Sequence, residues 1–201
     1  MERIASFCVD HTRLLPGMYL SRQDGADGEI LTWDIRMKQP NKGSYLSPAA
    51  AHTLEHLFAT YARNSKYSRG VVYVGPMGCL TGFYLLTTGL TPAEALDLTR
   101  SAFAWMAEYE GEIPGASAVE CGNYLMMDPI AARAEAAAML PVLEGLDAEK
   151  LEQVELLPYH VTAGAKYAMV GRQYRPEFDT AAAPNLNTGI FLAHGIACTH
   201  L

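Results

Sequence analysis

Hydrophobic and polar residues alternate along residues 29–37, which read EILTWDIRM. Leu31, Trp33 and Ile35 fall on one side of an extended chain, and polar residues dominate the other side. A period of two predicts a β-strand with one strongly apolar face. Two further segments, 70–76 and 81–89, are rich in β-branched and aromatic residues and are bounded by Gly and Pro, so they are also predicted to be strands.

Three helices are predicted from a shared start signal. A side chain that can cap a helix directly precedes a proline at Ser47, Thr91 and Asp128. After Ser47, apolar residues recur with a helical period as far as Tyr61. The other two helices are expected at about 92–110 and 129–144, followed by a short charged helix at about 147–156.

The predicted strands and helices are interleaved without a regular βαβ rhythm. We therefore expect an α+β fold, with a largely antiparallel sheet packed with helices in a single domain. Residues 157–201 differ in character, because they are richer in Pro, Gly, Thr and Asn and have only patchy periodicity. The expected division is a catalytic domain over residues 1–156 and a C-terminal extension over residues 157–201.

Composition narrows the classes of function. The 201 residues are 50% hydrophobic and 18% charged, with a formal net charge of −7. An acidic chain argues against nucleic acid or an anionic membrane as the main partner. The first residues have no apolar core of the length of a signal peptide, and no run approaches the roughly 20 apolar residues of a membrane span. A cytoplasmic protein is expected, with its four widely spaced cysteines serving as thiols or metal ligands.

The segment HTLEH, residues 52–56, is the main candidate for chemistry. On a helix, His52 and His56 lie on one face, one turn apart, so both imidazoles can reach one metal ion. Glu55 borders that face and can act beside the metal as a general acid or base. The order H-x-x-E-H is that of inverted zinc hydrolases. The alternative is a surface helix that happens to carry two histidines and a glutamate.

A catalytic metal normally has three protein ligands and an open position. Cys79 lies on a Gly-flanked turn between two predicted strands, where Gly78 and Gly82 would allow close approach of a substrate, and Cys121 lies on a turn before the Asp128 helix. Spacing does not select the third ligand, and each thiol has the alternative of being a small buried side chain. Other candidates are carboxylates and the remaining histidines: His11, His160, His194 and His200.

In the extension, His194, Cys198 and His200 form a second group of metal-binding residue types. The simpler interpretation is that these residues occur there incidentally.

Five segments together resemble one known family. SFCVDH, DIRMKQPNK, HTLEHLFA, PMGCLTGFY and ECGNY occur in the order and spacing of S-ribosylhomocysteine lyase, the LuxS family, over roughly residues 3–156. The resemblance implies a homodimeric α+β enzyme that cleaves the thioether of S-ribosylhomocysteine without a redox cofactor. The products in the family are homocysteine and 4,5-dihydroxy-2,3-pentanedione, the precursor of a quorum-sensing signal.

The resemblance also implies roles for individual residues. It makes His52, His56 and Cys121 the ligands of one divalent metal per chain, which in the family is ferrous iron and is often found as zinc after isolation. Glu55 and Cys79 resemble the two acid/base residues. Residues Ser6, His11 and Arg36 match positions that hold the substrate.

The sequence departs from the family pattern beside the site. Tyr73-Val74-Gly75 replaces the usual Asp-x-Ser before the Pro-Met-Gly-Cys turn, and Leu125-Met126-Met127 replaces a more polar stretch. Two alternatives to the lyase therefore stay open. One is a zinc hydrolase that uses the same helix face, and the other is a non-catalytic relative that keeps the metal site.

Overall fold

Four antiparallel strands form the sheet of this protein, in the order β1-β2-β4-β3. The computed structural model describes residues 11–148, 154–156 and 198–200. The chain falls into two units, residues 1–151 and 152–201, and the sheet belongs to the first. Its strands are β1 (Gly17–Asp24), β2 (Ile30–Arg36), β3 (Val71–Pro76) and β4 (Gly82–Thr88).

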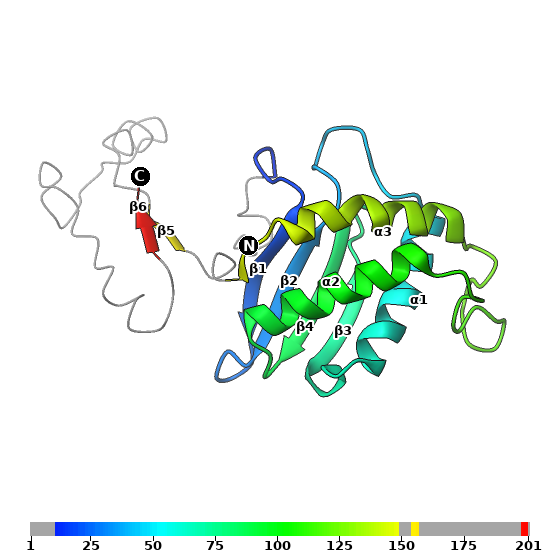
Figure 1. Cartoon of the computed structure of the whole chain (residues 1–201), viewed down its shortest axis with the longest axis horizontal. Helices are drawn as coiled ribbons and strands as arrows, with labels where there is room; N and C mark the ends of the chain where they lie inside the picture. Colours follow the sequence, from blue (N-terminus) through cyan, green and yellow to red (C-terminus); the bar gives the residue numbers. More distant parts are fainter. Residues whose placement is uncertain (1–10, 149–153, 157–197, 201) are drawn as a thin grey trace, which may run out of the picture. The chain divides into compact units, whose positions relative to one another are not determined.

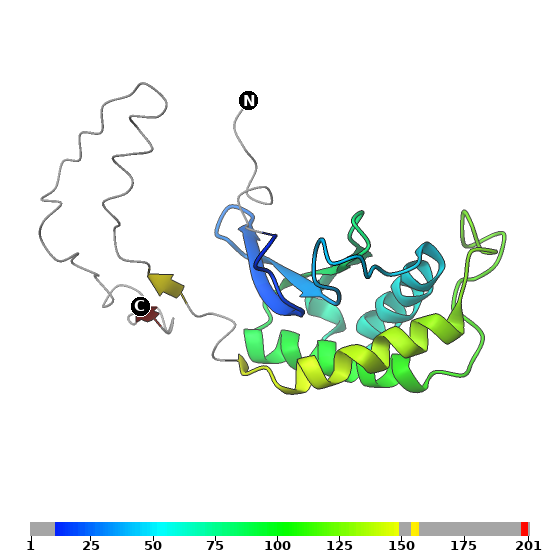
Figure 2. The same cartoon turned by 90° about the horizontal axis from the view of Figure 1, so that it is seen from above.

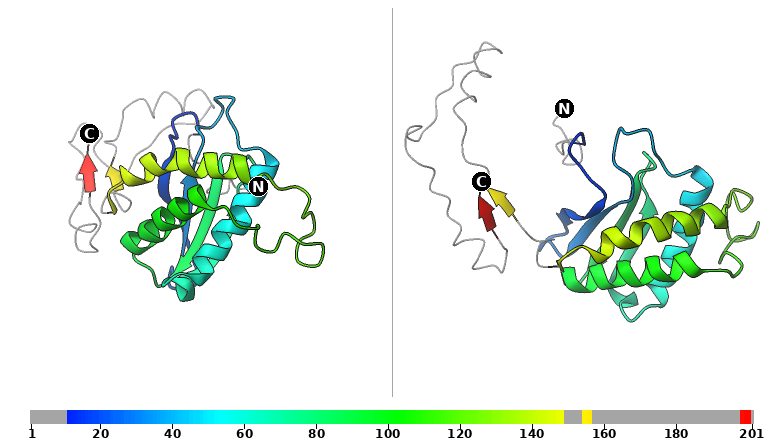
Figure 3. Two further views of the ribbon diagram at one scale, coloured as in Figure 1. Left: turned by 45° about the vertical axis from the view of Figure 1, so that its right-hand side comes forward. Right: turned by 45° about the horizontal axis from the view of Figure 1, so that its top comes forward.

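Three helices lie over one face of this sheet (Figures 1 and 2). They are α1 (Pro48–Asn64), α2 (Pro92–Glu108) and α3 (Pro129–Glu144). Figure 3 shows α2 and α3 running side by side, with the loop that joins them close to the N-terminal half of α1. The expected α+β class with an antiparallel sheet is therefore confirmed.

Each helix begins at the predicted cap. The side chains of Ser47, Thr91 and Asp128 accept hydrogen bonds from the backbone N–H three residues later, and a proline follows each of them. Thr91 also forms a complete capping box with Glu94. The helix boundaries were predictable because these signals are local in the sequence.

The core lies between the helices and the sheet. Trp33 and Ile35 of β2 are fully buried, and the Trp33 Nε1–H donates to Thr87 Oγ1 of β4 at 2.9 Å. Phe58 of α1 makes edge contacts with Phe83 and Phe103, with ring centroids 6.4 and 5.5 Å apart. These contacts join α1, α2 and the sheet into one packed unit.

The polar side of β2 is buried as well. Thr32, Asp34 and Arg36 are 6%, 8% and 2% exposed. The Arg36 guanidinium pairs with the Asp34 carboxylate through Nη2. A buried ion pair on the sheet face away from the helices is unusual for a strand, because burying charge costs free energy unless the charges are paired.

Two segments differ from the sequence expectation. Strand β1 was not predicted, because a register irregularity between Leu20 and Arg22 interrupts its alternation and half of its residues are exposed. Val154–Leu156 form a strand, β5, which is paired in parallel with β6 (Cys198–His200), so the predicted helix at 147–156 is wrong at its C-terminal end. Residues 149–153 and His194 lie outside the described residues, and the boundary at 156 stays a prediction.

Within the described part of the chain, the structure has no helix that is long and apolar enough to span a bilayer.

The hydroxyl of Thr53 ties α3 to α1. This side chain is fully buried; its Oγ1 donates to the Ala49 carbonyl at 2.8 Å and accepts from the Asp128 N–H at 2.8 Å. The N–H of Asp128, the N-cap residue of α3, therefore depends on a side chain of α1 for its hydrogen-bond acceptor. The same contact holds the end of the loop that precedes α3.

We predict that Thr53→Val lowers the free energy of unfolding by about 1–3 kcal/mol, because the shape is kept while the Asp128 N–H loses its acceptor. Urea unfolding of the metal-free protein measures this change. Thr53→Ser keeps the hydroxyl and is the control. Equal stability of Thr53→Val and the wild type would show that this hydrogen bond contributes nothing.

Candidate metal centre

Helix α1 places His52 and His56 one turn apart on the same face. Their ring centroids are 4.8 Å apart, and their planes are inclined by 82°. Both side chains are half-buried, whereas Leu54, Leu57 and Phe58 of the same helix are buried in the core. The packing of the apolar face therefore fixes the direction in which the two imidazoles point.

Backbone carbonyls orient both rings. His52 Nδ1 lies 3.0 Å from the Met126 carbonyl oxygen, and His56 Nδ1 lies 2.7 Å from that of Pro114. A carbonyl only accepts, so Nδ1 carries the proton in each ring and Nε2 keeps its lone pair for a metal. Met126 belongs to one of the departures from the family pattern, but it acts here through its backbone, which a change of side chain leaves in place.

Cys121 completes the donor set. Its Sγ lies 3.4 Å from His52 Nε2, and the ligand atoms of His52, His56 and Cys121 all lie within 4.8 Å of one another. The Asn123 N–H also approaches this sulfur, at 3.4 Å. Two imidazole nitrogens and one thiolate form a set that suits zinc or ferrous iron.

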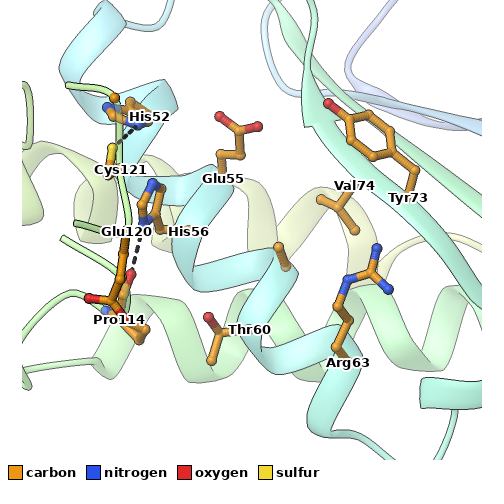
Figure 4. A pocket seen from close by; sticks show the side chains of 13 residues that line it. His52, Glu55, His56, Thr60, Arg63, Tyr73, Val74, Pro114, Glu120 and Cys121 are labelled. Atoms are coloured by element: carbon orange, nitrogen blue, oxygen red, sulfur yellow. Dashed lines mark hydrogen bonds between the residues drawn. The ribbon is translucent and has the colours of Figure 1, made fainter. Parts of the chain in front are cut away.

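A pocket of about 540 Å³ opens beside these donors (Figure 4). Glu55 lines this pocket next to the histidines without belonging to the donor group, so its carboxylate is placed to act on a bound molecule. Arg63 and Tyr73 line the far side. The pocket thus combines the three donors with two carboxylates, Glu55 and Glu120, and one cation, Arg63.

Tyr73 and Gly75 are linked by their packing. A Cβ atom placed on Gly75 would lie 2.3 Å from the Tyr73 hydroxyl oxygen. The phenol therefore occupies space that any other residue at position 75 would fill. Tyr73 and Gly75 are thus a coupled pair, of which Tyr73 lines the pocket, and Figure 4 shows the Tyr73 ring on the side across from the histidines.

Cys79 belongs to a different cluster of side chains. Its Sγ lies 3.9 Å from Arg36 Nη1 and 3.0 Å from the Thr81 hydroxyl, and Arg36 Nη1 donates to Thr81 at 2.5 Å. Cys79 is exposed, whereas Arg36 and Thr81 are each 2% exposed. The exposed Cys79 therefore lies against two buried polar side chains, Arg36 and Thr81. Cys79 is not among the residues that line the pocket.

The buried carboxylate of Asp34 anchors this cluster. Burial raises the pKa of Asp34, whereas its hydrogen bond to Arg36 and the nearby charges of Arg36 and His11 lower it. The interaction with His11 brings a second predicted substrate residue close to the buried pair of Asp34 and Arg36. Ser6 lies outside the described residues.

The sequence-based site is thus divided between two clusters. His52, Glu55, His56 and Cys121 line the pocket, and Arg36 and Cys79 meet on the sheet. Sequence reasoning missed Thr81 and Asp34. The i+2 spacing of Asp34 and Arg36 is the signal that could have found Asp34, since such residues share a strand face, whereas Thr81 follows Cys79 on a turn and has no such signal.

The reason proposed for Gly82 was wrong. A Cβ atom there would lie 2.1 Å from the Ile35 carbonyl oxygen, so the close approach is to strand β2 and not to a substrate. At Gly78 an added Cβ would meet open space, which leaves room beside Cys79.

Known proteins match most of the chain. The family model of S-ribosylhomocysteinase (LuxS) matches residues 4–149. The S-ribosylhomocysteine lyase of Desulfotalea psychrophila is 50% identical over 139 residues, which is 68% of this chain and 87% of the relative. That of Phocaeicola vulgatus is 48% identical over 155 residues, which is 75% and 96% of the two chains. That of Borreliella burgdorferi is 41% identical over 155 residues, or 76% and 99%.

The match covers both clusters and all three helices, and the metal donors assemble as the resemblance implied. The chain belongs to the LuxS family of S-ribosylhomocysteine lyases.

Proposed function

We propose that this chain cleaves the thioether of S-ribosylhomocysteine, yielding homocysteine and 4,5-dihydroxy-2,3-pentanedione, by carbonyl migration and β-elimination. The observation that carries the proposal is the placement of Glu55 in the pocket beside the His52, His56 and Cys121 donors. A metal that only stabilised the fold would need no acid/base group at its open side.

The chemistry explains the residue types. A thiolate leaves readily only when the neighbouring carbon carries an acidic proton. Moving the sugar carbonyl along the chain by enolisation supplies that acidity, and β-elimination then breaks the C–S bond. Each enolisation takes one proton from carbon and returns one to another atom, so the reaction needs acid/base groups.

The metal and the two acid/base residues divide this work. A divalent cation at the three donors supplies Lewis acidity for the enediolate charge. Glu55, which is half-buried in the pocket, moves a proton on the metal side. The sulfur of Cys79, which lies 3.9 Å from Arg36 Nη1, accepts a proton on the other side. Ferrous iron in the cell and zinc after isolation remain proposals.

Arg36, His11 and Ser6 are proposed to hold the substrate. The Arg36 Nε and Asp34 Oδ1 are buried and have no hydrogen-bond partner among the described residues. Buried donors without a partner are rare, which supports a ligand on this face. We further propose that the chain forms a homodimer, as the family resemblance implies, and that it is cytoplasmic.

The alternatives are separated by one assay. A zinc hydrolase would release no thiol from S-ribosylhomocysteine, and a non-catalytic relative would bind metal without turnover. The third ligand is a cysteine here, whereas inverted zinc peptidases use a glutamate. Incubating pure protein with S-ribosylhomocysteine and measuring free thiol with a colour reagent distinguishes all three, and thiol release is expected.

We predict that the purified protein holds one divalent metal per chain and that Cys121→Ala loses most of it, because two imidazoles alone are a poor site. Elemental analysis of both proteins provides the test. Cys79→Ala is the matched control, since it removes a thiol that is not in the donor group. Full metal content in Cys121→Ala would remove this residue from the site.

We predict that Glu55→Gln and Cys79→Ala each reduce kcat by at least about 10²-fold, the usual contribution of a general acid or base. Metal content should stay near that of the wild type in both variants, because neither residue is a ligand. Steady-state thiol release and elemental analysis measure the two quantities. Nearly full kcat in Cys79→Ala would contradict the mechanism, and metal loss in Glu55→Gln would make Glu55 a ligand.

We predict that Gly75→Ala raises KM several-fold with unchanged metal content. The new methyl group displaces the Tyr73 phenol, the exposed end of a side chain, so the pocket wall moves at little cost to stability. The double variant Tyr73→Ala/Gly75→Ala lacks the displaced ring, and it should have the KM of Tyr73→Ala alone. Additive effects of the two substitutions would refute the coupling.

A further inference from the structure

Thr81 lies directly beneath the exposed thiol of Cys79, and no role has been assigned to it so far. Its side chain is 2% exposed, and its hydroxyl oxygen lies 3.0 Å from Cys79 Sγ. The hydroxyl also receives a 2.5 Å hydrogen bond from Arg36 Nη1. Thr81 is therefore in contact with both the cation and the sulfur of the cluster.

The backbone holds Thr81 in a fixed position. Its carbonyl oxygen accepts from the N–H groups of Met37 and Lys38, both at 2.9 Å, just after strand β2. Leu80, one residue earlier, has a positive φ of 58°. Its N–H donates to the Met77 carbonyl, and its carbonyl accepts from the Leu46 N–H. This turn places Cys79 and Thr81 side by side with little freedom to separate.

The direction of the hydrogen bonds follows from the donors. An arginine only donates, so the Thr81 oxygen is the acceptor of the Arg36 bond. The single hydroxyl proton of Thr81 is then available for another acceptor. Cys79 Sγ at 3.0 Å is much closer than Met77 Sδ at 3.9 Å. A base must be ionised to take a proton, so in the proposed role of Cys79 its sulfur can only accept, and the O–H of Thr81 then donates to it with the Arg36 charge behind that hydroxyl.

The carboxylate of Asp34 fixes the guanidinium of Arg36 from the side away from Thr81. It pairs with Nη2 of Arg36, which leaves Nη1 directed at Thr81 and Cys79. A hydroxyl polarised by a cation is a stronger donor than a free one. An ionised sulfur is a better acceptor than a neutral thiol, so the Thr81 hydroxyl is suited to orient Cys79 when it acts as a base.

We propose that Thr81 is a positioning residue for the lyase reaction, whose hydroxyl links Cys79 to the Arg36 guanidinium and holds its sulfur in place for proton transfer. The inference rests on the proposed role of Cys79 as a base. In that step a substrate C–H bond breaks, an S–H bond forms, and the electron pair stays on the substrate as an enolate. Thr81 keeps its own proton and only orients the sulfur before the transfer.

The test compares Thr81→Val, which keeps the shape without the hydroxyl, with Thr81→Ser, which keeps the hydroxyl. Alkylation of Cys79 by iodoacetamide at pH 7 is followed on the metal-loaded protein by mass spectrometry of the Cys79 peptide. We expect alkylation to slow by about 10-fold in Thr81→Val, the effect of losing one charge-assisted hydrogen bond, and to stay near the wild-type rate in Thr81→Ser.

The same variants are then assayed for thiol release across pH. In Thr81→Val, kcat/KM should fall across the pH range, while metal content is unchanged. Wild-type alkylation and pH profile in Thr81→Val would overturn the proposal, and so would equal losses in the Val and Ser variants. Alkylation needs no substrate, so it tests Thr81 even if the wild type released no thiol.

Discussion

Two hydrogen bonds from histidine to backbone carbonyls hold together the candidate metal centre of this protein. Cys121 lies in the loop between α2 and α3, over residues 109–128, where the structure has neither helix nor strand. The His56 bond to Pro114 and the His52 bond to Met126 attach that loop to α1 on either side of Cys121. The bonds that orient the rings therefore also bring the third donor to them.

The cluster around Cys79 depends on buried charges, whose desolvation costs free energy. Arg36 and Asp34 are buried on the sheet face away from the helices, and their pairing offsets part of the desolvation that each would suffer alone. The Arg36 guanidinium is held in place by this pairing, and its Nη1 group still donates to other side chains. A cation held beneath an exposed thiol is useful for proton transfer, which gives a functional reason for an arrangement that stability alone does not favour.

The sequence predicted those parts of the structure that depend on neighbouring residues. The three helix starts followed from a capping side chain before a proline, and β2 followed from its alternation. Strand β1 was not predicted, because an edge strand with an irregular register has no regular alternation of hydrophobic and polar residues. The spacing of HTLEH indicated two ligands, but Cys121 is 65 residues after His56, and only the family resemblance singled it out. The contacts of Thr81 needed coordinates, because they depend on how a turn folds against another strand.

The carbonyl of Met126 has a consequence for how such a loop can change over generations. Every residue type offers the same carbonyl oxygen, so a mutation at position 126 can replace the side chain and leave the orientation of His52 intact. Selection for metal binding then acts on the path of the backbone and hardly at all on the residue type at position 126. A search for invariant side chains would pass over this position, although the geometry of the centre depends on it.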